Sequence, residues 1–193
     1  MLVRSGLMLV FLDFEASSLS KQSYPIEVAW MFEDGRSEAH LIRPLPEWTD
    51  WDDEAEAIHG ISCATLLRDG TDPAHVAARM VETLGGHDLL ASAPSWDGKW
   101  LSVLLRGGGL PRHALRLRDS DDVHADAASA ILADAVPPDR LRATVDELLA
   151  RAEPRAAGLP PAHRALADAE EERQRWIQVR AAAIRLAAEL RAQ

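Results

Sequence analysis

The sequence contains a single cysteine, Cys63, among its 193 residues. One cysteine excludes an intramolecular disulfide and a cluster of thiolate metal ligands, so we expect a reducing, cytoplasmic location. Long hydrophobic runs are also missing, because no apolar stretch approaches the roughly 18 residues that cross a bilayer. The apolar run near the amino terminus lacks a small-residue cleavage site and leads directly into Phe11-Leu12-Asp13, which is typical of a first strand rather than a signal peptide. We therefore expect no membrane partner.

Positive charge is scarce. The chain carries 21 Lys+Arg against 31 Asp+Glu, a formal net charge of −10, and its only lysines are Lys21 and Lys99. This balance argues against a protein that binds nucleic acid by bulk charge, since neutralising phosphates requires a basic face. It does not exclude an enzyme that holds metal ions with carboxylates and meets phosphates through those ions.

Glycine-rich nucleotide-binding loops are missing as well. The triplet Gly107-Gly108-Gly109 follows a predicted helix and does not match G-x-G-x-x-G. The sequence contains no G-x-x-x-x-G-K-[ST] motif. These absences argue against dinucleotide-binding and P-loop proteins.

What remains is a chain long enough for a proper core, with 47% hydrophobic residues. We expect one domain over residues 1–193. The patterns predict strands at residues 7–14, 26–32, 38–42, 89–93 and 115–117, and helices at residues 73–84, 96–105, 125–135, 139–152 and about 162–191. Residues 46–60 show no clear period and predict a loop with a short helical turn. Strands followed by helices interleaved with strands predict an α/β fold with a mixed sheet.

The long C-terminal helix carries one apolar stripe. Its members recur at spacings of three and four residues: Trp176, Val179, Ala183, Leu186 and Leu190. Such a stripe either packs on the domain or forms the contact of a homodimer.

Asp13 and Glu15 close the first predicted strand. Alternate residues of a strand project from the same face, so the two carboxylates point together. Buried carboxylates require compensating positive charge, and oxygen ligands at close range suit Mg²⁺ or Mn²⁺. The alternative is that the strand simply emerges into water at this point.

Three further polar residues stand at helix starts. Asp97 follows Pro94 and begins a helix, where an acid is also favoured by the helix dipole alone. His163 and Asp168 lie at the start of the last helix, and His163 could reach over the site that Asp168 faces. Taken singly, His163 and Asp168 are equally compatible with an ordinary surface.

Taken in order, these pieces resemble one known family. Asp13-Phe14-Glu15, Asp97 after Ser-Ala-Pro-Ser-Trp, and His163-x-x-x-x-Asp168 are similar to the three motifs of the DEDDh 3′–5′ exonucleases. This superfamily includes ribonuclease T, oligoribonuclease and polymerase proofreading subunits. Residues 58–62, Ile-His-Gly-Ile-Ser, also resemble a segment found between the first two motifs of many members.

The resemblance implies a ribonuclease-H-like fold, in which a mixed five-stranded sheet is flanked by helices. It implies that Asp13, Glu15, Asp97 and Asp168 hold two divalent cations, Mg²⁺ or Mn²⁺, and that His163 is the general base. The physical logic agrees, because four adjacent carboxylates repel one another and paired cations relieve that repulsion.

The resemblance also implies how the 3′-terminal nucleotide is held. Leu19 would wedge against the terminal base, with the backbone near Ser17 and Ser18 alongside it, and His59 would lie close to the terminal nucleotide. The more usual Thr-Gly of the first motif is replaced here by Ser-Ser.

Aromatic and basic residues outside the motifs suggest further contacts. Trp48 and Trp51 are hypothetical stacking platforms for unpaired bases, whereas Trp30 and Trp100 are better interpreted as core. A mid-chain arginine cluster either guides a phosphate backbone or forms a solvated face; it comprises Arg106, Arg112, Arg116 and Arg118.

The sequence therefore predicts a metal-dependent 3′–5′ exonuclease acting on the 3′ end of single-stranded RNA or DNA. Two alternatives use the same fold. One is a catalytically weak nucleic-acid-binding or regulatory module, and the other is a phosphodiesterase of small nucleotides.

Overall fold

A single mixed sheet organises the described part of the chain, which comprises residues 6–152 and 164–192 of a computed structural model. Its strand order is β3-β2-β1-β4-β5. The strands are β1 (Leu9–Ala16), β2 (Pro25–Phe32), β3 (Ser37–Leu41), β4 (Asp88–Ala91) and β5 (Leu117–Asp119). β1, β2 and β3 pair antiparallel, whereas β4 and β5 add in parallel to β1. The predicted α/β class, a mixed five-stranded sheet flanked by helices, is confirmed.

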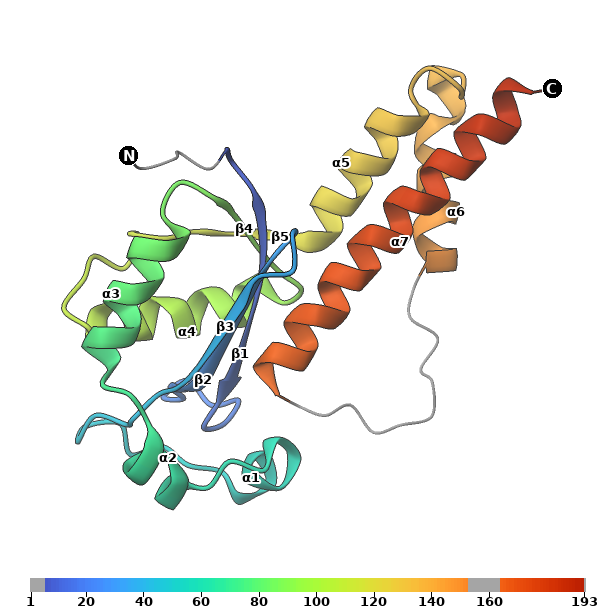
Figure 1. Cartoon of the computed structure of the whole chain (residues 1–193). Helices are drawn as coiled ribbons and strands as arrows, with labels where there is room; N and C mark the ends of the chain where they lie inside the picture. Colours follow the sequence, from blue (N-terminus) through green and yellow to red (C-terminus); the bar gives the residue numbers. More distant parts are fainter. Residues whose placement is uncertain (1–5, 153–163, 193) are drawn as a thin grey trace.

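Helices cover both faces of this sheet (Figure 1). On one face lie α3 (Pro73–Leu84) and α4 (Pro94–Gly107), and on the other lies α7 (Ala165–Arg191). The remaining helices are α1 (Asp53–His59), α2 (Cys63–Asp69), α5 (Ser120–Leu132) and α6 (Pro138–Ala152). In the described part of the chain, no helix is long and apolar enough to cross a membrane.

Side chains alternate between the two faces of the sheet along β1, so even- and odd-numbered residues contact different helices. Val10, Leu12 and Phe14 are buried in the core that β1 shares with α3 and α4. Phe11 points to the opposite face, where its ring lies 6.0 Å from that of Trp176 on α7. Because side chains alternate along a strand, the next odd-numbered residues of β1 also face α7. These residues are Asp13 and Glu15.

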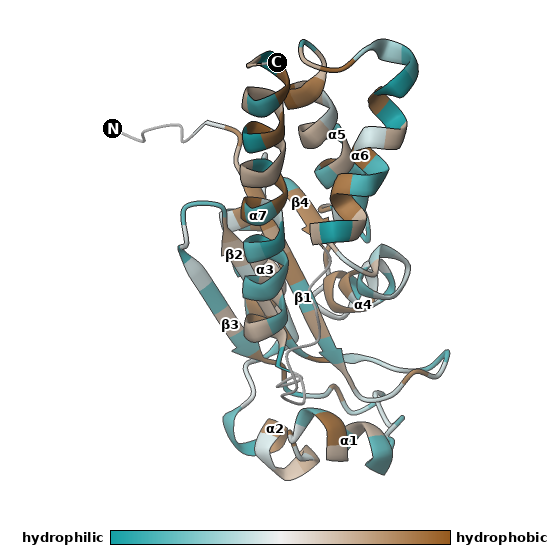
Figure 2. Cartoon of the chain, turned by 90° about the vertical axis from the view of Figure 1, so that its right-hand side faces the viewer, coloured by the Kyte–Doolittle hydropathy of each residue, from teal (hydrophilic) through white to brown (hydrophobic). Residues whose placement is uncertain are grey.

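The helix α7 extends beyond the sheet, and its C-terminal half packs with α5 and α6 to form a helical lobe (Figures 1 and 2). This lobe has an apolar core of its own, in which Leu132, Val145 and Val179 are buried. Of the stripe predicted on α7, Trp176, Val179 and Ala183 are buried, whereas Leu186 and Leu190 are half-buried beside α6. Its packing on the domain accounts for the pattern.

In residues 46–60, where the sequence predicted a loop with a short helical turn, the structure has the helix α1, and a second short helix, α2, follows it. Asp52 caps α1 by accepting a hydrogen bond from the Glu54 amide, and Gly60 ends the helix with a φ of 68°. Ser62 then caps α2. The prediction fell short here because each helix has only seven residues, too few to establish a 3.6-residue period.

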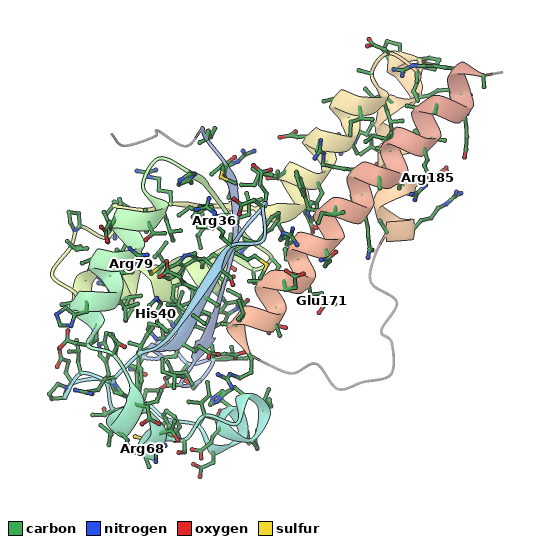
Figure 3. All side chains as sticks on the ribbon, viewed as in Figure 1. Arg36, His40, Arg68, Arg79, Glu171 and Arg185 are labelled. Carbon is green, nitrogen blue, oxygen red and sulfur yellow. The ribbon has the colours of Figure 1, made fainter. Side chains whose placement is uncertain are left out.

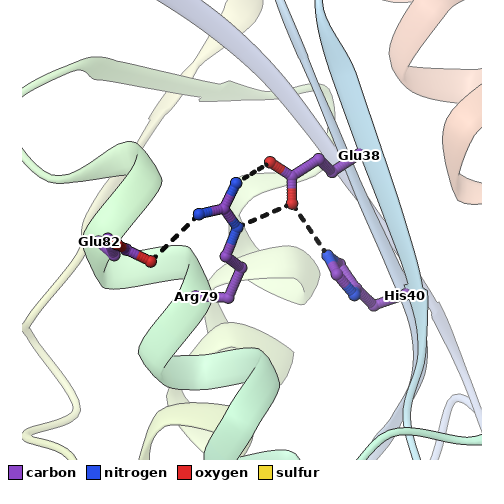
Figure 4. Close-up of polar contacts among 4 residues, drawn as sticks. All are labelled: Glu38, His40, Arg79 and Glu82. Carbon is purple, nitrogen blue, oxygen red and sulfur yellow. Dashed lines mark hydrogen bonds and ion pairs between the residues drawn. The ribbon is translucent and has the colours of Figure 1, made fainter.

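The edge strand β3 is tied to α3 by a polar network (Figure 4). The Arg79 guanidinium donates to both oxygens of Glu38, at 2.6 and 3.0 Å, and to Glu82 at 3.1 Å. His40 lies 3.4 Å from Glu38, and its ring stacks on buried Trp30. Figure 3 shows Arg79 and His40 on this flank, well away from Glu171 and Arg185 on α7.

Candidate active site

Three carboxylates from two distant segments meet on the α7 face of the sheet. Asp13 and Glu15 come from β1, and Asp168 comes from the first turn of α7. One carboxylate oxygen from each lies within 4.8 Å of the other two. The strand supplies two groups two residues apart, and the helix that crosses it supplies the third.

Asp97 joins this group from the first turn of α4. Its side chain is only 2% exposed, and one of its carboxylate oxygens is buried without a hydrogen-bond partner. The α4 backbone begins at Pro94, and the Asp97 amide donates to the Ala93 carbonyl at 3.0 Å. A hydrogen bond with the Phe14 backbone connects the carboxyl group to β1. Its charge acts on Asp13 and on Glu15, so Asp97 lies near the group formed by Asp13, Glu15 and Asp168 without being one of the three whose oxygens lie within 4.8 Å.

The electrostatics of the group are unfavourable for full ionisation. Burial, followed by the charges of Asp97, Asp168, Glu15 and Glu27, raises the pKa of Asp13 to about 9. Burial and the charge of Asp168 are the largest of several causes that raise the pKa of Glu15 to about 7. Burial also raises the pKa of Asp97 to about 7, against the opposing effect of its backbone hydrogen bonds. At neutral pH the site holds protons that a bound cation would displace.

Glu27 is a fifth acidic residue that the sequence analysis missed. It lies on β2 directly opposite Glu15 in the antiparallel register and is 3% exposed. Arg164 contacts both of its oxygens, at 2.6 and 3.0 Å, and the Ala165 amide donates to it at 3.1 Å. The available signal was an acid inside the otherwise apolar strand Pro25–Phe32.

This contact sets where α7 begins. Glu27 accepts from the residue before the helix and from the first helical amide, so its carboxylate fixes the entry of the chain into α7. Asp168 lies one turn further on, facing β1. By fixing the start of α7, Glu27 helps to orient Asp168. Arg164 compensates the negative charge of Glu27.

The donor set fits a hard divalent cation. All four converging groups offer carboxylate oxygens, which suit Mg²⁺ or Mn²⁺ rather than softer metals. Arg164, the cation beside the group, is engaged by Glu27. The buried, unpartnered oxygen of Asp97 is a further sign that the site is built to receive a cation.

The remaining predicted site residues have varied surroundings. His163 lies outside the described residues. Leu19 is 71% exposed at the tip of the loop that follows β1. The hydroxyl of Ser17 accepts from the Tyr24 amide at 3.1 Å, and that of Ser18 bonds to Asp50 and to the Ser20 amide. Both hydroxyls therefore shape the loop that presents Leu19.

His59 ends α1 and is buried. Its Nδ1 accepts from the Ile61 amide at 3.1 Å, and its ring lies edge-on to Trp51. Trp51 also donates from Nε1 to Glu56, and Trp48 stacks on Tyr24 at 5.3 Å. Trp30 and Trp100 are buried, as predicted.

The arginines of the mid-chain cluster differ in their partners. Arg118 pairs with Asp88 at 2.6 Å, and Arg106 donates to a carbonyl of its own helix. Arg112 and Arg116 line a hollow of about 450 Å³ beside α4.

A further hollow of about 810 Å³ lies between α6 and α7, and the described residues that line it include none of the predicted site residues.

The fold resembles that of exonuclease I. The apo form of that enzyme matches at a TM-score of 0.63 and 17% identity, over 96% of this chain and 44% of that chain. The Escherichia coli enzyme with a dA16 oligonucleotide matches at 0.63 and 18% identity, over 90% and 41% of the two chains. Its zinc-bound complex with single-stranded DNA gives 0.62 and 17%, over 88% and 39%.

These values establish a common fold, the ribonuclease-H-like fold that the sequence predicted. The present chain spans less than half the length of these exonuclease I chains. No protein-family model matches the chain, and no curated protein matches it by sequence.

Proposed function

We propose that the chain is a metal-dependent 3′–5′ exonuclease of the DEDDh superfamily, which hydrolyses phosphodiester bonds at the 3′ ends of single strands. The observation that carries this proposal is the cluster of Asp13, Glu15 and Asp168, with oxygens within 4.8 Å, on a sheet of this fold. Structures of exonuclease I with single-stranded DNA share the fold and support the choice of substrate.

Four side chains would hold two divalent cations: Asp13, Glu15, Asp97 and Asp168. When bound, the cations supply Lewis-acid stabilisation of phosphate oxygens and acidify water. The protein contributes a partly buried site in which electrostatic interactions are stronger than in bulk water. The raised pKa values of Asp13, Glu15 and Asp97 mean that binding of cations releases protons.

His163 is proposed as the general base, on the motif that it forms with Asp168. An imidazole with an ordinary pKa of about 6.5 can accept a proton near neutral pH. Replacing His163 with alanine should slow cleavage by about 10²–10⁴-fold and leave the affinity for Mn²⁺ unchanged. Equal losses of affinity and rate would instead make His163 a metal ligand.

The direct test is cleavage of matched RNA and DNA oligomers labelled at the 5′ end. We expect a ladder of products shortened from the 3′ end with Mg²⁺ or Mn²⁺, and none with a chelator. The relative rates on the two oligomers define the sugar preference.

The same assay separates the alternatives. Absence of shortening with either metal, together with retained binding of the oligomer, would support a binding or regulatory module. Cleavage limited to dinucleotides would support a phosphodiesterase of small nucleotides. An oligomer ending in a 3′ phosphate serves as a matched control for recognition of the free 3′ end.

A further inference from the structure

The two lysines of the chain meet in one place. Lys21 and Lys99 line a hollow of about 260 Å³ together with Ser95 and Trp96. Lys21 comes from the loop after β1, and the other three residues come from the first turns of α4. In a chain with a net charge of −10, this concentration of ammonium groups is a distinct chemical feature.

Lys99 is held in a fixed position. Its Nζ donates to the Ser20 carbonyl at 2.5 Å and to the Ser23 hydroxyl at 2.7 Å. An ammonium has three donors, so these two bonds leave one for a ligand. The same Ser23 hydroxyl accepts from Nε1 of Trp100 at 3.0 Å, which secures the loop against α4.

Trp96 supplies an apolar wall. It is 38% exposed, although its ring stacks on buried Trp100 with centroids 5.6 Å apart. The Lys99 ammonium lies 5.1 Å from the Trp96 centroid. Ammonium groups next to an exposed, supported aromatic ring can bind both the phosphate and the base or sugar of a nucleotide.

The hollow is built from the two segments that carry Asp97 and the predicted substrate residue Leu19. Trp96 directly precedes Asp97, and Lys21 follows exposed Leu19 by two residues. A strand whose 3′ end occupies the carboxylate site has further nucleotides to place on its 5′ side.

We propose that this hollow is a subsite for an unpaired nucleotide on the 5′ side of the scissile bond. Its backbone phosphate lies between the ammonium groups of Lys21 and Lys99, and its sugar and base lie against Trp96. This inference rests on the proposed exonuclease function. Because every base has a face that can stack on an aromatic ring, contacts of this kind are tolerant of sequence.

Two substrates of different length test the subsite. The p-nitrophenyl ester of thymidine 5′-monophosphate occupies the cleavage site alone, whereas a single-stranded oligomer also reaches the hollow. Lys21→Gln should raise KM for the oligomer about tenfold, the usual effect of losing roughly one charged contact, without changing kcat. Hydrolysis of the ester should be unchanged, and Lys21→Arg should restore most of the oligomer KM.

The salt dependence provides a matched readout. For the oligomer, the slope of log KM against log salt concentration should fall by about 0.7 in Lys21→Gln, as expected for one lost phosphate contact on a single strand. Arg185→Gln, at the hollow between α6 and α7, is the control and should leave KM unchanged. Equal effects of Lys21→Gln on both substrates, or no effect on either, would overturn the subsite.

A binding measurement keeps this test separate from the proposed function. Acylation of Lys21 by an amine-reactive reagent, followed by peptide mass spectrometry, should slow several-fold when a phosphorothioate-linked oligomer, which resists hydrolysis, is present with Mn²⁺. Thymidine 5′-monophosphate should give no protection. If the wild-type protein cleaves neither substrate, the exonuclease proposal fails, whereas lack of Lys21 protection by a bound oligomer rejects the subsite.

Discussion

Asp13 is the residue of the site whose pKa is raised most by burial and by the charges of its neighbours. Four other acidic groups raise its pKa, in addition to burial. A buried group of this kind is costly to the folded state whenever it is ionised without a cation. Removing the Asp13 carboxylate should therefore lower the activity but maintain or increase the stability of the metal-free protein.

Replacing Asp13 with asparagine should lower the cleavage rate by at least about 10²–10³-fold, because a ligand for the cations is lost. The metal-free protein should remain folded and melt at the same or a higher temperature, since a repelling charge is gone. Calorimetry in chelator, together with the oligomer assay, measures both effects.

Asp34→Asn is the matched control, because Asp34 is an exposed acid paired with Arg36 on the turn after β2. It should alter neither cleavage nor the response to metal. An Asp13→Asn protein that fails to fold would identify Asp13 as a structural residue instead.

The sequence singled out Asp13, Glu15, Asp97 and Asp168 because, taken in order, they resemble three motifs of one family. Glu27 escaped prediction for a physical reason. It lies in mid-strand, and only the pairing of β2 with β1 places it beside Glu15. Such cross-strand proximity depends on register, which the spacing of residues along one strand does not reveal.

At the scale of elements, the contact between β2 and the start of α7 fixes the position of the helix that carries Asp168. Glu27 is almost fully buried, whereas the Arg164 side chain is 52% exposed. The Arg164 guanidinium makes a bidentate contact with the Glu27 carboxylate, and the single ammonium of a lysine cannot reproduce this geometry.

Arg164→Ala should destabilise the protein by about 1.5–3 kcal/mol, because it leaves the buried Glu27 carboxylate with less compensation. It should also weaken the affinity for Mn²⁺, since the first turn of α7 carries Asp168. Denaturant unfolding and metal titration monitor the two effects, and Arg164→Lys should restore little of either.

A double-mutant cycle with Glu27→Gln isolates the pair from other effects of each change. Arg68→Ala, which breaks the exposed pair of Arg68 and Asp69, is the control and should have no measurable effect. Additive effects of Arg164→Ala and Glu27→Gln would rule out the coupling.

The elements themselves were predicted unevenly. The strands β1, β2 and β3 were evident from apolar or alternating runs, which end at acidic residues in β1, at a glycine turn after β2 and at prolines after β3. The helices α1 and α2 were not, since caps at Asp52 and Ser62 define them more than periodicity does. The start of α5 was placed too late, because its first turn, Ser120-Asp121-Asp122, is polar.

At the scale of the whole molecule, the carboxylate site links stability to pH. Asp13, Glu15 and Asp97 have raised pKa values in the folded protein, so the folded state binds more protons than the unfolded state above pH 4. Stability therefore falls as pH rises. Buried His124, whose pKa burial lowers to about 4, opposes this trend below about pH 6.5.

Without metal, the melting temperature should decrease as pH rises from about 6.5 to 9, where the carboxylates lose their protons and His124 no longer contributes. Adding Mg²⁺ or Mn²⁺ should raise the melting temperature more at pH 8 than at pH 6, because cations compete with protons for the same oxygens. Thermal scans with metal and with chelator measure the difference. A metal-free protein that is equally stable at pH 6.5 and 9 would contradict this account.

If the proposed function is correct, the net charge of −10 should make binding to nucleic acid dependent on metal. Occupied by cations, the carboxylates lose their repulsion toward phosphates, while the remaining acidic excess disfavours tracking along a duplex. We expect the affinity for a single-stranded oligomer to fall at least tenfold in chelator, as measured by fluorescence anisotropy. Tight binding without metal at physiological salt would be inconsistent with this view.

Because α7 is long, packing in the helical lobe affects the position of Asp168 at the other end of the helix. The helix has 27 residues and is about 40 Å long, with Trp176 against Phe11 near its middle. Asp168 lies eight residues before Trp176, about 12 Å along the axis. A tilt of about 5° around this pivot would displace Asp168 by about 1 Å, a misplacement that can cost roughly 100-fold in rate. By packing against the C-terminal half of α7, α5 and α6 help to fix the orientation of the helix, and with it the position of the Asp168 carboxylate.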